Sequence, residues 1–114
     1  MNLKEMTAQE IFTKVKNHLL KQNARSITVD GTDCAYRGRG GLMCAAGCLI
    51  DDEDYSVGFE KEPWELILSN LPEKYNNHEL LISNLQTTHD TSPPEFWVSE
   101  LKKLAVKNNL KYDI

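Results

Sequence analysis

The segment from Ser26 to Cys48 constrains the fold more than any other part of the sequence, because turn signals divide it into short runs. Asp30-Gly31 suits the positive φ angles of a tight hairpin turn, and Gly-Arg-Gly-Gly at 38–41 is a second turn signal. The runs that these turns separate are 26–29, 34–37 and 42–44. β-branched and aromatic residues in the first two runs are typical of strands. The pattern predicts a small antiparallel sheet of about three strands.

Helical periodicity occurs on both sides of this segment. Thr7 and Glu10 have the spacing of a capping box, and a helix is expected from about Ala8 to Lys21. Other expected elements are helices at 63–71, at 79–89 and after Ser92-Pro93-Pro94, a short buried helix within 45–50, and an edge strand at 110–114. The side chains expected in the core are Ile11, Phe12, Val15, Leu19, Trp64, Ile67, Leu68, Leu71, Leu81, Ile82, Leu85, His89, Trp97, Leu101, Leu104 and Ala105. Together these elements predict an α+β fold in which the sheet packs against three to four helices.

A chain of 114 residues can build one hydrophobic core, so residues 1–114 are expected to form a single domain. No apolar run approaches the roughly 20 residues needed to cross a bilayer, and residues 1–5 lack the charged-then-apolar order of a secretion signal. Three cysteines, an odd number, fit reduced thiols. We therefore expect a cytoplasmic protein that does not bind membranes.

Charge is distributed unevenly along the chain. Residues 1–50 carry seven Lys/Arg and four Asp/Glu, residues 51–100 carry two and twelve, and residues 101–114 carry four and one. The acidic middle would repel a nucleic-acid backbone, so binding to a nucleic-acid polymer is not expected. The acidic segment Asp51–Glu65 has two interpretations: a solvated surface, or a surface that binds a basic partner protein.

The densest group of candidate binding residues lies at 36–41, with the sequence Tyr36-Arg37-Gly38-Arg39-Gly40-Gly41. Glycines let backbone N–H groups converge on an anion, arginines can hold phosphate oxygens with paired hydrogen bonds, and a tyrosine ring can stack on a base. These residues are candidate contacts for a nucleotide or a phosphate. The alternative is that the glycines only close a hairpin, and no Walker-type or dinucleotide-binding glycine motif is present.

Cysteine and histidine side chains suggest two further kinds of site. Cys34, Cys44 and Cys48 with His89 are candidate zinc ligands, although only Cys44 and Cys48 approach the usual ligand spacing. Cys44 with His89, oriented by Asp90, is a candidate nucleophile and base. Buried free thiols and a histidine at the end of its helix are the simpler interpretation, so neither a metal, nor a cofactor, nor a catalytic residue is expected.

Four motifs spread over most of the chain occur together: Thr7-Ala8-Gln9-Glu10-Ile11-Phe12, Cys34-x-Tyr36-Arg37-Gly38, Gly41-Leu42-x-Cys44-Ala45-x-Gly47-Cys48-Leu49-Ile50, and Leu85-Gln86-x-x-His89-Asp90 with a later tryptophan. In this combination the chain resembles a family of small proteins of tailed bacteriophages and prophages that have no assigned activity. The resemblance implies the cytosol of a bacterial host as the setting. By analogy with small phage proteins, it also implies a binding role against host defence.

Three functional hypotheses follow. The first is a non-enzymatic binding protein that sequesters a nucleotide immune signal through Tyr36, Arg37 and Arg39. The second is an inhibitor that binds a host protein, for example a nuclease, through the acidic segment Asp51–Glu65. The third is an enzyme that uses Cys44 and His89.

A homo-oligomer, with a dimer favoured, is expected because a monomer of this length buries only about two-thirds of the surface of the unfolded chain. Some large apolar side chains should then lie at a subunit contact, and the candidates are Phe59, Trp64, Phe96 and Tyr112. Light scattering coupled to size exclusion at micromolar concentration should give a mass near twice 13.0 kDa. A mass near 13.0 kDa across the whole peak would contradict the dimer.

Overall fold

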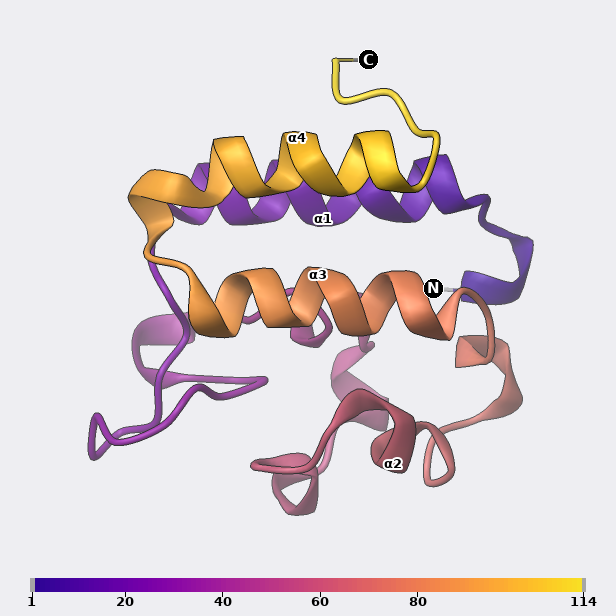
Figure 1. Ribbon diagram of the computed structural model, residues 1–114. Helices are drawn as coiled ribbons and strands as arrows, with labels where there is room; N and C mark the ends of the chain where they lie inside the picture. The colour runs from indigo at the N-terminus through magenta and orange to yellow at the C-terminus, as the bar shows by residue number, and fades with distance from the viewer. Residues whose placement is uncertain (1, 114) are drawn as a thin grey trace.

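Three helices that pack against one another form the centre of the computed structural model, which describes residues 2–113 (Figure 1). These helices are α1 (Ala8–Gln22), α3 (Glu79–Thr91) and α4 (Trp97–Lys107). Figure 1 shows α1 and α3 running in the same direction and α4 running in the opposite one. The short helix α2 (Trp64–Leu68) packs against α3 on the side away from α1 and α4.

The first helix begins where the capping box predicts. Thr7 Oγ1 accepts the N–H of Glu10 at 3.1 Å, and Glu10 Oε1 accepts the N–H of Thr7 at 2.8 Å, so two backbone donors at the helix start are satisfied. The helix ends at Gln22, followed by Asn23 in the left-handed conformation with φ of 50°. The expected helix from Ala8 to Lys21 is therefore confirmed and extends one residue further.

Short 3-10 turns join these helices in place of longer regular elements. They are η1 (Leu3–Glu5), η2 (Arg39–Gly41), η3 (Gly47–Leu49), η4 (Asp52–Asp54), η5 (Val57–Phe59), η6 (Glu73–Tyr75) and η7 (Pro94–Phe96). The helix expected within 45–50 is one such turn, η3. The edge strand expected at 110–114 does not form over 110–113, where Lys111 instead exchanges two hydrogen bonds with the side chain of Gln9, and Ile114 lies outside the described residues.

The expected three-stranded sheet is absent from residues 2–113, so the α+β prediction is wrong and the fold is helical. The three runs pair at two isolated antiparallel bridges, Ile27 with Cys34 and Arg37 with Met43. The β-branched and aromatic residues of these runs favour extended backbone, but a pleated sheet also needs consecutive backbone groups that are free to pair.

Side chains from other parts of the chain bond the backbone groups that a sheet would need. The bonds run from Ser26 N–H to His89 Nε2 (2.9 Å), from Tyr36 N–H to Glu60 Oε1 (2.8 Å), from Arg37 N–H to Glu60 Oε2 (3.2 Å) and from Met43 N–H to Gln22 Oε1 (3.0 Å). An N–H that donates to a side chain is not available to a neighbouring strand. Pairing therefore stops at single bridges.

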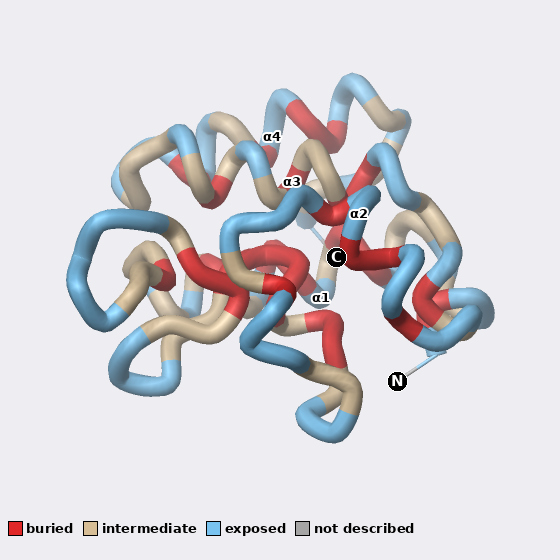
Figure 2. The backbone as a smooth tube through the Cα atoms, turned by 90° about the horizontal axis from the view of Figure 1, so that it is seen from below, coloured by how far each residue is buried: buried red, intermediate tan, exposed pale blue. Residues whose placement is uncertain are grey.

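The apolar positions expected in the core are buried, which confirms the helical periodicity. They belong to one cluster that joins the helices to the segment between α1 and α3, and Figure 2 shows exposed backbone mainly at the outer loops. Among the four residues proposed for a subunit contact, Phe59 and Trp64 are in this core, Tyr112 is half-buried, and Phe96 is 55% exposed. Among residues 2–113, no helix is long and apolar enough to span a bilayer.

We predict that Gly47→Ala destabilises the fold, because a Cβ atom at position 47 would lie 2.2 Å from the carbonyl oxygen of Tyr36. Moving backbone to relieve that contact should lower the free energy of unfolding by about 2–3 kcal/mol, measured by urea denaturation. Gly58→Ala is the matched control, since Gly58 also lies in a 3-10 turn and its Cβ would meet Ser56 Oγ at 3.5 Å. Equal urea midpoints for the two variants would contradict this close packing.

Candidate functional site

Tyr36, one of the predicted nucleotide contacts, is inside the protein. Its side chain is 5% exposed, and its hydroxyl donates to the carbonyl oxygen of Glu62 at 2.5 Å. Its backbone N–H donates to Glu60, whose carboxylate also accepts the N–H of Arg37 and the hydroxyl of Tyr55. The ring therefore packs in the core and is not available to stack on a base.

The guanidinium group of Arg37 is likewise bonded within the protein. Its Nη1 donates to Asp52 Oδ1 at 2.7 Å and its Nη2 to the carbonyl oxygen of Ile50 at 2.6 Å. The group lies over the ring of Tyr55, 5.0 Å from its centroid, and its Nε is buried without a partner among the described residues. Arg37 thus links the acidic segment Asp51–Glu65 to the rest of the fold, so the paired N–H groups of its guanidinium are not free to bind a phosphate.

The glycines at 38–41 serve the backbone turn. A Cβ on Gly38 would lie 2.5 Å from Ser26 Oγ and 2.6 Å from the carbonyl oxygen of Ile27, so this position requires glycine. Gly40 and Gly41 have φ of 70° and 78°, and they close the turn beside the bridge between Arg37 and Met43. The arrangement agrees with the hairpin-closing interpretation, and it leaves the side chain of Arg39 exposed.

The cysteines do not assemble as either site hypothesis expected. Cys44 is buried and its Sγ accepts the N–H of Gly47 at 3.2 Å, while Cys48 Sγ contacts the carbonyl oxygen of Ala45 at 3.1 Å. It is Cys34 that lies beside His89 and Asp90, with the possible ligand atoms of these three residues within 4.8 Å of one another. Neither Cys44 nor Cys48 joins such a group within the described chain.

His89 is held by hydrogen bonds that argue against a metal. Its Nε2 accepts the N–H of Ser26 at 2.9 Å, so the ring proton is on Nδ1 and is donated to Asp90 Oδ1 at 2.7 Å. A metal-bound imidazole normally donates its second N–H, whereas here the second nitrogen is an acceptor, so a metal on Nδ1 would require an imidazolate. The ring also stacks on Trp97, 5.6 Å between centroids. His89 therefore joins α3 to the backbone at Ser26, and neither nitrogen can act as a base for a thiol.

Burial also keeps the three cysteines protonated. It raises the pKa of the Cys34 thiol to about 11 and that of the Cys48 thiol to about 12, and it also raises the pKa of the Cys44 thiol. A nucleophilic cysteine needs a lowered pKa, so these environments favour structural thiols.

A second acidic group, Asp51, Glu53 and Asp54, places possible ligand atoms within 4.8 Å of one another. The ammonium group of Lys74 already occupies this position, 2.8 Å from Asp51 Oδ2 and 3.3 Å from Asp54 Oδ2. The hydrogen bond from Lys74 lowers the pKa of Asp51 to about 2. The carboxylates of Asp51 and Asp54 therefore anchor the loop to Lys74.

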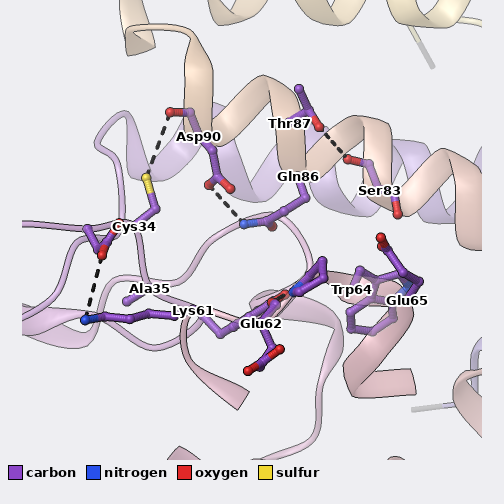
Figure 3. Close-up of a pocket in the computed structure, with 13 residues that line it drawn as sticks. Cys34, Ala35, Lys61, Glu62, Trp64, Glu65, Ser83, Gln86, Thr87 and Asp90 are labelled. Carbon is purple, nitrogen blue, oxygen red and sulfur yellow. Dashed lines mark hydrogen bonds and ion pairs between the residues drawn. The ribbon is translucent and has the colours of Figure 1, made fainter. Parts of the chain in front are cut away.

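The structure also contains a cleft of about 590 Å³ that the sequence did not indicate (Figure 3). It lies between α3 and two segments, 33–36 and 61–65, and Figure 3 shows Ser83, Gln86 and Asp90 of α3 facing the 61–65 segment. Four carboxylates and one ammonium group line it: Asp33, Glu62, Glu65, Asp90 and Lys61. The cleft is therefore acidic and disfavours an anionic ligand. Its charged residues come from three separate segments without a common motif, so the sequence gives no sign of the cleft.

Comparisons with protein-family models, with curated proteins and with solved structures found no significant match to this chain.

We predict that alkylation by iodoacetamide near pH 7.5 is slow at all three cysteines in the folded protein, roughly tenfold or more below free cysteine, because the thiolate is the reactive form. The rate at Cys34, which lines the cleft, should increase as the pH approaches its pKa of about 11. Peptide mass spectrometry after timed quenching measures each site, with the unfolded protein in urea as the control. A cysteine that reacts faster than free cysteine would restore the enzyme hypothesis.

Proposed function

We propose that this protein is a non-enzymatic binding protein that attaches to a basic surface of another protein through its acidic segment Asp51–Glu65. The observation that supports this proposal is that the carboxylates of that segment are of two kinds. Some bond to the protein's own groups and hold the segment in place, while others are exposed and their carboxylates have no partner among residues 2–113.

The inner carboxylates determine the shape of the segment. Glu60 accepts two backbone N–H groups and the Tyr55 hydroxyl, and Asp51 and Asp54 hold Lys74. Asp52, whose side chain is 92% exposed, bonds Arg37 at 2.7 Å. These bonds link a segment with little regular structure to the rest of the fold, so its outer charges are preorganised and less entropy is lost when a partner binds.

The outer carboxylates provide the binding charge. Glu53, Glu62 and Glu65 are exposed, and their side-chain carboxylates form no hydrogen bond or ion pair with residues 2–113. Unpaired charges of one sign on one segment accelerate encounter with an oppositely charged partner and disfavour like-charged ones. We name Glu53, Glu62 and Glu65 the acidic face.

The nucleotide hypothesis receives less support from the geometry. Tyr36 and Arg37 are bonded inside the protein, and Arg39 is the predicted contact that keeps an exposed side chain. The setting that we propose for the acidic face follows the resemblance to phage proteins. In that setting the partner is a basic host protein in the cytosol, such as a nuclease, and binding acts against host defence.

We predict that the triple variant Glu53→Lys, Glu62→Lys, Glu65→Lys loses at least about tenfold of its partner binding. The tagged protein is incubated with a bacterial lysate, and recovered proteins are quantified at salt concentrations from about 50 to about 300 mM, since exposed charges are screened over this range. Wild-type capture should decrease with salt. The variant should still fold, because these side chains have no partners in residues 2–113.

The matched control reverses three exposed carboxylates outside the acidic face, Glu5→Lys, Glu79→Lys and Glu95→Lys, and produces the same change in net charge. It should retain the salt-sensitive capture. Equal losses in both triple variants would show that only net charge matters, which would contradict a specific acidic face.

A further inference from the structure

We infer that the cleft beside α3 is an anchor site for one lysine or arginine side chain of the partner, with its peptide group. This inference rests on the proposed function, because it supplies the acidic face with a recessed site next to Glu62 and Glu65, which line both. A cleft of about 590 Å³ lies within the roughly 300–1,000 Å³ range of sites that enclose a small ligand, so it can accept an extended side chain.

The charges that line the cleft select a cation. Asp33, Glu62, Glu65 and Asp90 outnumber the single ammonium group of Lys61. Lys61 Nζ lies 3.8 Å from Asp33 Oδ2, at the limit of an ion pair, and both side chains are more than half exposed. Such a pair contributes little stability, so an incoming cation can replace Lys61 beside Asp33.

Asp90 is the carboxylate whose position is fixed. Its Oδ1 accepts hydrogen bonds from His89 Nδ1 at 2.7 Å and from Gln86 Nε2 at 3.0 Å, and its other oxygen has no bond to the described residues. Gln86 is itself fixed because its Oε1 accepts the N–H of Ala46 at 2.9 Å. Since His89 is neutral, the Asp90 charge is not neutralised by that contact, and a fixed carboxylate can bond a cation without reorganising.

The indole N–H of Trp64 indicates a peptide in preference to a metal ion. Trp64 contributes to the wall of the cleft and is 1% exposed, and its Nε1 is buried without a hydrogen-bond partner in residues 2–113. A buried donor that lacks an acceptor is unfavourable. A peptide carbonyl that reaches this N–H as the wall of the cleft adjusts can accept it, whereas a metal ion offers no acceptor. Figure 3 shows Trp64 opposite Gln86 and Ser83, on the side of the cleft that carries Glu62 and Glu65.

The test uses the full chain and a defined probe, N-acetyl-arginine methylamide, whose neutral isostere is the corresponding citrulline compound. The protein has two tryptophans and therefore two indole N–H resonances, assigned with Trp64→Phe. Titration of the arginine probe should shift the Trp64 resonance progressively. The Trp97 resonance should not move, because its N–H already donates to the carbonyl oxygen of Ser92 at 2.8 Å. Citrulline should shift neither resonance, and equal responses to the two probes would overturn the inference.

Three variants distinguish binding in the cleft from loss of folding. Lys61→Gln removes the competing ammonium and should tighten arginine binding by about two- to fivefold, the range of an exposed ion pair, which a misfolded protein cannot imitate. Glu62→Gln with Glu65→Gln should weaken binding by about the same factor or more, and Glu5→Gln with Glu95→Gln should leave it unchanged. Unchanged affinity in both cleft variants would overturn the inference.

The two proposals can fail separately. If the arginine probe does not shift Trp64 while the acidic face still captures its partner in a salt-sensitive way, the anchor site is wrong and the proposed function stands. If the probe binds but charge reversal of the acidic face leaves partner capture unchanged, the cleft is a cation site and the proposed function is wrong.

Discussion

The segment between α1 and α3 has little regular secondary structure, yet much of its backbone is buried and must find hydrogen-bond partners. Helix side chains supply many of them. His89 and Gln86 of α3 bond the N–H groups of Ser26 and Ala46, and Gln22 of α1 bonds both the N–H and the carbonyl oxygen of Met43. Because a lost bond would leave a buried backbone group unsatisfied, these few contacts determine how the segment lies on the helices.

The same constraint explains why residues that look functional in the sequence are structural. Polar and aromatic side chains beside glycines suggest a ligand site, but Tyr36, Arg37 and His89 each bond groups of the protein itself. Gly38 and Gly47 allow two backbone segments to approach closely. The residues left for function are exposed carboxylates without a side-chain partner among residues 2–113 and the residues that line a cleft, and they carry no recognisable motif.

Prediction from the sequence succeeded where structure depends on neighbouring residues. The capping box of Thr7 and Glu10 and the apolar stripes of the helices are local patterns, and α1, α3 and α4 formed as expected with their stripes buried, whereas the helix expected at 63–71 is limited to α2 (Trp64–Leu68). It failed for the sheet because backbone N–H groups within residues 26–43 donate to the side chains of Gln22, Glu60 and His89, which lie outside that segment. Strand propensity is a weak preference, and tertiary hydrogen bonds overrode it.

The sequence by itself determined three long helices, their buried faces, the turns at Gly31 and Gly38–Gly41, and the concentration of acidic residues after residue 50. Only the tertiary structure decided which carboxylates are paired, which cysteine lies beside His89, and that Asp33, Glu62, Glu65 and Asp90 line one cleft. The physical reason is the distance along the sequence over which each kind of interaction acts. Helix periodicity and turn geometry arise from contacts within a few residues, whereas ion pairs and clefts depend on how distant segments pack around one core.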